Sequence, residues 1–352
     1  MSDVAGEGDH RLIFRVDRGD AAHRLDRVLV RRLAGFPGLS RTRLQAWIVE
    51  GRVRVNGAPV LRPSERLALG DEVEALLPPP PPARPAPAAQ EIPLTILYED
   101  DWLLAVAKPP GIVVHPTLGH ADGTLLNALL WHLRETGTRP GLVNRLDKGT
   151  SGVLLAAKSG DLHGRLARAM RSRTAVKEYL ALVYGAPRLA RGRIECGILR
   201  DPADPKRMST SRTEGRASVT LYETVATSAG PGGGLSLTLL RCRLLTGRMH
   251  QIRVHLAAEG LPLVGDPLYG EPRWKGIRDP AVAAACRDFP RQALHAHHLV
   301  VTHPVTGETL DVTAPLPEDL RGLLAVAGMA AAPYPCGCPT DPSVGFGFAG
   351  AL

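Results

Sequence analysis

The chain has 352 residues and a formal net charge of +8, with 43 Lys and Arg residues against 35 Asp and Glu residues. This length allows two domains with sizeable cores, and the positive balance favours a polyanionic partner, nucleic acid ahead of an anionic membrane. The apolar runs are too short for a membrane span, and the acidic N-terminus argues against a signal peptide. Five scattered cysteines form neither an even disulfide framework nor paired CxxC knuckles, so we expect a cytoplasmic, reduced protein without a structural metal.

Residues 12–77 predict a small unit of two helices and a hairpin. Arg24–Leu33 places its apolar residues at helical spacing. Ser40 is a suitable N-cap for a second helix, which Gly51 ends. Asn56-Gly57 then supplies the tight turn of a hairpin. We therefore expect a compact α/β module at this end of the chain.

Ten arginines against six acids make residues 24–77 basic, and most of these arginines lie on or just after the two helices. Arg suits a nucleic-acid surface because its guanidinium fork meets phosphate oxygens bidentately. With Arg24-Leu25-Asp26, Ser40-Arg41 and Val53–Gly57 in this order, the unit resembles the alpha-L RNA-binding motif. A solvated basic face is the alternative. The candidate RNA-binding residues here are Arg24, Arg41, Arg43, Arg52 and Arg54.

A Pro/Ala-rich stretch, residues 78–91, separates this unit from the rest of the chain. Consecutive prolines cannot join a helix or an inner strand, and they favour an extended, semi-rigid linker. The domain that follows is expected to span residues 92–325. From residue 330 the composition turns to Ala, Pro, Gly and Cys, so residues 330–352 are expected to form a disordered tail.

One carboxylate, Asp147, lies in a short polar loop ahead of a predicted buried strand, Val153–Ala157. Arg145 and Lys148 flank it, and nearby positive charge favours the ionised form of an acid. An ionised carboxylate suits a nucleophile or a base better than a general acid. The alternative is an Asp that caps a turn and pairs with a neighbouring Arg.

Two further side chains are candidates for the same site. Tyr179 begins a predicted strand, and its ring could either stack on a nucleobase or belong to the core. Arg253 lies on a predicted helix beside Ile252 and Leu256, at the edge of that helix's apolar stripe. An Arg in such a position tends to be fixed by a carboxylate.

The histidines do not predict a metal site. His250 and His255 lack the HExxH spacing, and no cysteine pair lies nearby. His295, His297 and His298 lie in a strand-like run, where alternation points neighbouring side chains to opposite faces. We therefore expect no metal.

The loop around Asp147 resembles a known catalytic signature. Asn144–Gly152 is similar to that of RluA/RluD-type pseudouridine synthases, and the resemblance spans roughly residues 92–318. Together with the N-terminal module it is nearest to the RluD branch. The other matching blocks, in the same order, are Lys108–Gly111, Lys177–Tyr179, Gly247–His255, Gly265–Gly270 and His295-Ala296 with Thr302–Pro304 and Gly307.

The resemblance implies an α+β fold, with a mixed, largely antiparallel central sheet and a cleft. It also implies that Asp147 is the catalytic aspartate, that Arg253 pairs with it and that Tyr179 stacks on the target uracil. Arg145 lies where the family uses an Arg to help displace the base. One position departs: Asn144 stands where His or Gly is usual, and Asn cannot titrate.

The expected function is isomerisation of uridine to pseudouridine in RNA, with large-subunit ribosomal RNA as partner. The uracil must leave its stack because the chemistry is at its glycosidic bond and C5. Asp147 either attacks C1′ or removes the 2′ proton, and the sequence leaves both open. No oxidation or group transfer from a donor is involved, so no cofactor is expected, and we expect a monomer.

Two other classes of protein remain. One is a catalytically silent RNA-binding or ribosome-assembly factor, which would be expected to lack Asp147 or Arg253. The other is a hydrolase with a carboxylate nucleophile. A glycosidase usually needs a second carboxylate across the sugar, and a phosphatase a metal-binding acid cluster. Residues 142–158 offer only Asp147 and no such cluster.

Overall fold

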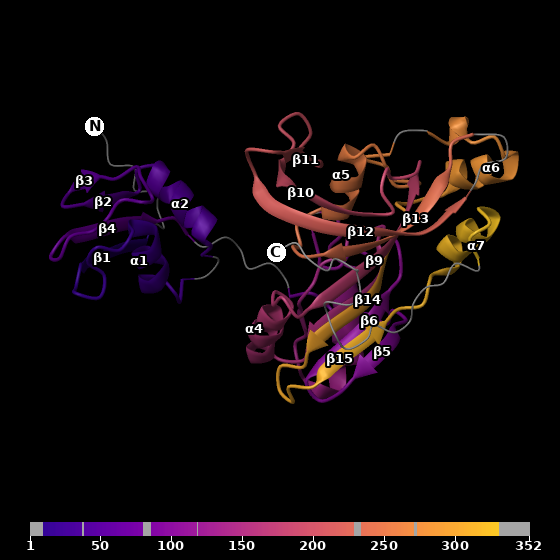
Figure 1. Ribbon diagram of the computed structural model, residues 1–352. Coiled ribbons are helices and arrows are strands. Elements are labelled where there is room, and N and C mark those ends of the chain that lie inside the picture. The colour runs from indigo at the N-terminus through magenta and orange to yellow at the C-terminus, as the bar shows by residue number, and fades with distance from the viewer. Residues whose placement is uncertain are drawn as a thin grey trace. The chain divides into compact units, whose positions relative to one another are not determined.

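The computed structural model describes residues 10–36, 39–79, 86–117, 119–228, 234–270 and 273–330 (Figure 1). The chain divides into two compact units, Met1–Ala86 and Pro87–Leu352, each with its own core. The boundary falls within the stretch expected to be a linker. All but the first residue of the expected tail, residues 330–352, lies outside the described residues. Within the described part of the chain, no helix is long and apolar enough to cross a membrane.

The N-terminal unit packs two helices on one four-stranded antiparallel sheet of order β1-β4-β2-β3. Ser40 caps the second helix, accepting the Arg43 backbone N–H at 3.2 Å. Asn56 and Gly57 both have positive φ, 51° and 78°, as a tight hairpin turn requires. The first strand was not anticipated. The elements are β1 (His10–Arg15), α1 (Leu25–Arg32), α2 (Arg41–Val49), β2 (Val53–Val55), β3 (Ala58–Pro59) and β4 (Glu72–Leu77).

The C-terminal unit is built on one large sheet, eleven-stranded over its described residues. Its order is β11-β10-β12-β13-β9-β14-β8-β6-β5, with β15 beside β14 and β7 beside β8. The β14–β8 pair is parallel and the other described pairs are antiparallel. The α+β class with a mixed, largely antiparallel sheet is therefore confirmed.

The strands of this sheet include the predicted buried run after the Asp147 loop, Val153–Ala157, which lies within β8. Their bounds are β5 (Thr95–Glu99), β6 (Leu103–Lys108), β7 (Gly141–Leu142), β8 (Ser151–Ala157), β9 (Val176–Tyr184), β10 (Arg191–Arg200), β11 (Met208–Ser211), β12 (Arg216–Ser228), β13 (Leu237–Leu244), β14 (Leu294–Thr302) and β15 (Thr309–Thr313). The helices are α3 (Leu125–His132), α4 (Gly160–Ala169), α5 (Gln251–Ala258), α6 (Pro280–Asp288) and α7 (Glu318–Val326), with short 3-10 turns at Arg134–Thr136 and Arg273–Gly276.

Alternation along β9 decides which face carries the candidate site. Leu180 and Leu182 join the core beneath α6 and α7, whereas Ala181 and Val183 join the core beneath α5. Tyr179 has the second parity and packs against the α5 core. The sheet therefore places Tyr179 on the face that α5 covers.

Gly152 lets two strands approach closely just after the Asp147 loop. Its φ is +118°, and a Cβ there would lie 2.1 Å from the carbonyl oxygen of Ala296. Ala296 is also its register partner in the parallel β8–β14 pair. Only glycine fits such a contact, so this position ties the start of β8 to β14.

Candidate active site

A buried lysine, Lys108, holds the loop that carries Asp147 through hydrogen bonds to backbone carbonyls. Lys108, at the end of β6, is 1% exposed and donates to the carbonyls of Pro109, Ile112 and Lys148 at 2.8, 2.9 and 3.1 Å. Burial, with the charge of Arg291, lowers the pKa of Lys108 to about 7. One amine thus joins the turn after β6 to the residue that follows Asp147.

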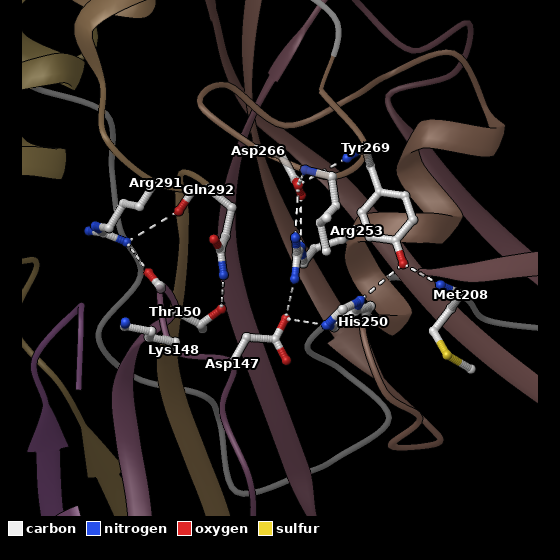
Figure 2. Close-up of polar contacts among 12 residues, drawn as sticks. Asp147, Lys148, Thr150, Met208, His250, Arg253, Asp266, Tyr269, Arg291 and Gln292 are labelled. Atoms are coloured by element: carbon white, nitrogen blue, oxygen red, sulfur yellow. Dashed lines mark hydrogen bonds and ion pairs between the residues drawn. The ribbon is translucent and has the colours of Figure 1, made fainter. Parts of the chain in front are cut away.

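Two residues of the segment before β14 also form hydrogen bonds with the Asp147 loop. Arg291 donates to the carbonyl of Gly149 at 2.9 Å and is itself paired with Asp319 at 2.6 Å. Gln292 donates from its amide to the Thr150 hydroxyl at 3.0 Å (Figure 2). The three residues that directly follow Asp147 are therefore held by side chains remote in sequence.

Arg253 joins two carboxylates and is 4% exposed. Its Nε and Nη2 donate to Asp266 at 2.7 and 2.8 Å, and its Nη1 donates to Asp147 Oδ2 at 2.8 Å (Figure 2). Burial alone would lower the pKa of Arg253, but the hydrogen bonds and charges of the two acids raise it. The guanidinium is thus a fixed cation in the site.

The predicted position of Arg253 at the edge of an apolar stripe is wrong. Every residue from Gln251 to Leu256 is buried. One side of α5 packs Ile252 against the β9 and β13 core, and another packs Val254 against Tyr269. Arg253 is therefore enclosed, and Asp266 supplies the charge that such a buried cation needs.

One oxygen of Asp147 has no partner among the described residues. Its side chain is 26% exposed, and Oδ2 accepts from Arg253. Among the described residues nothing donates to Oδ1. An oriented carboxylate with one unoccupied oxygen can act as a nucleophile or as a base.

The charge of Asp147 affects the pKa of Tyr179. The ring is half-buried against the α5 core, and the hydroxyl makes no hydrogen bond to any described residue. Burial, and then the charge of Asp147, raise the pKa of Tyr179. The phenol therefore stays neutral, and its ring packs against the core beneath α5, the helix that carries Arg253.

Comparison with known proteins identifies the family of the chain. Residues 102–258 match the family model described as RNA pseudouridylate synthase, and residues 24–73 match the S4 domain. The chain is 39% identical over 299 residues to ribosomal large subunit pseudouridine synthase D of Pseudomonas aeruginosa, across 83% of this chain and 88% of the relative. The chain belongs to the RNA pseudouridine synthase family. This confirms the resemblance, including the RNA-binding module, and makes the enzyme an isomerase rather than a hydrolase.

Other relatives of this pseudouridine synthase agree. The enzyme of the same name from Xanthomonas campestris is 42% identical over 309 residues, across 87% of this chain and 89% of the relative. In solved structures, human RNA pseudouridylate synthase domain containing 1 superposes with a TM-score of 0.52 at 27% identity, covering 69% of this chain and 90% of that one. Sequence and fold therefore point to one family.

Asn144 has a structural contact that explains its residue type. Its amide oxygen accepts the Leu155 N–H at 2.8 Å, and its amide nitrogen donates to the Val153 carbonyl at 3.2 Å. The side chain thus bonds to β8 as an additional strand residue would. It stabilises the loop of this pseudouridine synthase and contributes no titratable group.

None of the remaining predicted residues takes part in the contacts around Asp147 that are described above. Arg145 is exposed in the Asp147 loop. The other candidate arginines belong to the N-terminal unit, where Asp26, fully buried, accepts from Arg24 at 3.0 Å and from Arg41 at 2.8 Å. Arg43 and Arg54 are exposed, and Arg52 is half-buried beside Glu50 at 3.4 Å.

Sequence reasoning missed several side chains of this pseudouridine synthase. Asp266, His250 and Tyr269 fall inside blocks that carried the resemblance, but nothing local indicated that they meet. The burial of Arg253 was the signal that could have indicated Asp266, because a buried cation needs a nearby acid and Asp147 meets only one of its donors. Over the described residues, no group of three His, Cys, Asp or Glu side chains could hold a metal ion. A hollow of about 410 Å³ lies between α4 and the β14–β15 turn and is lined by neither Asp147 nor Arg253.

Proposed function

We propose that this enzyme converts uridine to pseudouridine in large-subunit ribosomal RNA, with Asp147 as its catalytic carboxylate. The names of the bacterial relatives support the substrate. The observation that carries the role of Asp147 is its asymmetry: Arg253 holds Oδ2 at 2.8 Å, and Oδ1 accepts from no described residue.

The reaction exchanges one bond to the sugar for another. The target uracil leaves its stack, and the Tyr179 ring offers it a flat apolar surface. The free oxygen of Asp147 attacks C1′, or it takes the 2′ proton so that C1′ and C2′ become doubly bonded; in both cases the N1–C1′ bond breaks with its electron pair going to the uracil. The base turns and C5 bonds to C1′, while the Asp147–C1′ bond breaks on the first route and Asp147 returns the proton to C2′ on the second. The C5 proton is then released and N1 gains a proton. Neither an oxidant nor a group donor enters this balance.

Arg253 keeps Asp147 aimed through these steps. Two donors to Asp266 fix its plane, and the third reaches Asp147. Arg145, exposed in the same loop, is the residue we assign to fill the space that the flipped base leaves.

The N-terminal unit is the proposed second handle on the RNA. Asp26 fixes Arg24 and Arg41 while both side chains stay exposed, 40% and 53%. Guanidinium groups held in this way lose little freedom when they meet phosphates. We therefore assign RNA binding to residues 12–77 and catalysis to residues 92–325, joined by the linker 78–91.

Pseudouridine mapping of total RNA tests this function. Cells with the wild-type gene, with no gene and with Asp147→Asn are compared. The proposal expects one or more large-subunit positions to carry pseudouridine only with the wild-type protein. Sites that persist in the Asp147→Asn strain but not in the null strain would contradict the role of Asp147. Sites confined to transfer RNA would contradict the substrate, and the absence of any dependent site would favour a silent RNA-binding factor.

A further inference from the structure

His250 adopts a backbone conformation that few residues other than glycine adopt. It precedes α5 with φ 55° and ψ 19°. Left-handed conformations cost a residue with a side chain roughly 1–2 kcal/mol, and they persist where the surroundings over-determine them. Here the conformation aims the imidazole at Asp147, with Nε2 lying 3.8 Å from Oδ2 (Figure 2).

Tyr269 determines which ring nitrogen of His250 carries the proton. The Met208 backbone N–H donates to the Tyr269 hydroxyl oxygen at 2.7 Å. The hydroxyl has one hydrogen, and among the described residues its remaining partner is His250 Nδ1, at 3.0 Å. The hydroxyl oxygen could accept a second hydrogen bond, but its own hydrogen finds a described partner only if Nδ1 accepts, so the pairing favours a neutral imidazole with its hydrogen on Nε2.

The Tyr269 side chain is itself held rigidly. Asp266 accepts its backbone N–H at 3.1 Å, and the guanidinium carbons of Arg253 and Arg207 lie 5.1 and 5.4 Å from the centre of its ring. The rings of His250 and Tyr269 meet edge to face at 82°. The relay from Met208 to His250 thus rests on the same carboxylate that orients Arg253.

The Nε2–H group of His250 is a donor that the described protein does not use. Its distance of 3.8 Å to Asp147 exceeds a hydrogen bond, and no other described acceptor lies in reach. Burial lowers the pKa of His250 and outweighs the charge of Asp147, which acts in the opposite direction. The lowered pKa favours the neutral ring. A preorganised donor beside the carboxylate can meet charge or an oxygen on a bound substrate.

We infer that His250 Nε2–H donates to a substrate oxygen that flanks the glycosidic bond, either uracil O2 or the ribose 2′-oxygen, and that Tyr269 is its positioning residue. The inference rests on the proposed function, which places C1′ beside Asp147. O2 gains negative charge when the N1–C1′ electron pair enters the uracil, and the 2′-hydroxyl is fixed by the same donor. No proton is transferred by His250 in either case.

Two substitutions separate the donor from the ring's other contacts. His250→Asn tolerates the left-handed backbone and places an oxygen near the Nδ1 position for Tyr269, but it leaves no donor near Nε2. His250→Gln places an amide nitrogen near Nε2. At saturating enzyme, we expect His250→Asn to slow single-turnover isomerisation by about 10²-fold with little change in RNA affinity. We expect His250→Gln to react about tenfold faster than His250→Asn.

A spectroscopic readout tests the relay without reference to activity. With ¹⁵N-labelled histidine, the wild-type His250 ring should show the Nε2–H tautomer. Tyr269→Phe should release it to a mixture that includes Nδ1–H. A wild-type ring with its proton on Nδ1 overturns the inference, whatever the activities of the variants.

Modified RNA identifies the oxygen. Target sites carrying 2-thiouridine or 2′-deoxyuridine are compared in wild type and His250→Asn. The acceptor is the oxygen whose modification in the RNA slows the wild-type enzyme but does not slow His250→Asn any further. If each RNA modification slows His250→Asn by the same factor as it slows wild type, the inference is overturned. A wild-type enzyme that isomerises no RNA contradicts the proposed function itself. An active wild type, an inactive Asp147→Asn and a His250→Asn at the wild-type rate contradict this inference alone.

Discussion

At the scale of single residues, the site consists of one carboxylate, Asp147, and the side chains that orient it. Arg253 occupies one oxygen of Asp147 and leaves the other free, while Asp266 prevents the arginine from turning. Removing one partner of such a buried pair typically costs about 3–5 kcal/mol, because the other charge is left uncompensated. Substitutions of Arg253 or Asp266 will therefore mix folding with catalysis, and Tyr179 and Asp147 are cleaner positions to probe.

Tyr179→Phe should be milder than Tyr179→Leu. The hydroxyl bonds to no described residue, so Phe keeps the flat ring and removes no hydrogen bond within the protein. Leu lacks the stacking surface, which is worth about 1–3 kcal/mol per base. Single-turnover rates on one target RNA measure both variants, with circular dichroism as the control for folding. Equal reductions in rate would show that the hydroxyl acts as an acid or base.

Single residues also show how far a sequence can lead. Asp147, Arg253 and Tyr179 lie in short blocks with local signals, so the sequence alone is enough to make all three candidates. Asp266 and Tyr269 carry no such signal, because their roles depend on a loop folding back over α5. Arg253 was misplaced at a helix edge because periodicity cannot reveal that a second layer covers the helix.

At the scale of elements, the β14–β15 hairpin contains a charged link to β9. His298 on β14 lies 2.7 Å from Asp311 on β15 and 3.4 Å from Glu178 on β9. Burial alone would lower the pKa of His298, but the hydrogen bonds to the two acids raise it. The cationic histidine therefore stabilises the junction beneath Tyr179, the neighbour of Glu178.

This link predicts a pH dependence of stability. A folded-state pKa above the unfolded value of about 6.5 gives stability that is fully present below that pH. It is lost as the pH rises through the raised folded-state value. Asp311→Asn should weaken this dependence, because it removes one of the charges that favour the cation.

Urea unfolding at pH 6 and pH 8.5 measures the effect. The difference between the two free energies of unfolding should be larger for wild type than for Asp311→Asn. Titrating groups shared by both proteins, such as Lys108, cancel in this comparison. Identical pH dependences would show that His298 is not the group responsible.

Elements were predicted better than their ends and partners. The strand β8 and the helices α1, α2 and α5 follow the sequence pattern, since each has a clear apolar pattern. β1 was missed because it pairs with β4, more than fifty residues away. Register across the sheet, including the Gly152–Ala296 contact, needs the tertiary structure.

At the scale of the whole molecule, charge and chemistry are assigned to different units. The proposed RNA handle ends before the linker, and the catalytic cluster begins after it. A stiff linker lets the first unit raise the effective concentration of the second at its RNA. The two functions should then be separable by truncation.

Deleting residues 1–86 should weaken RNA binding and leave the chemical step intact. Removal of one ion pair with a phosphate flattens the slope of log affinity against log salt by about 0.7–0.9. Single-turnover rates at saturating enzyme should match those of the full chain, and sub-saturating rates should fall. Full-length Arg41→Gln with Arg43→Gln is the matched control and should show a smaller effect of the same kind. An unchanged salt slope after deletion would remove the N-terminal unit as the RNA handle.

The most direct test of the account is the rate of tritium release from C5-labelled uridine in a target RNA, for wild type and Asp147→Asn under single-turnover conditions. The substitution keeps the size of the side chain and removes the charge of the free oxygen. The account predicts no measurable release from Asp147→Asn while its RNA affinity stays near that of wild type. A rate within about tenfold of wild type, equivalent to a barrier change of roughly 1.4 kcal/mol or less, would contradict it.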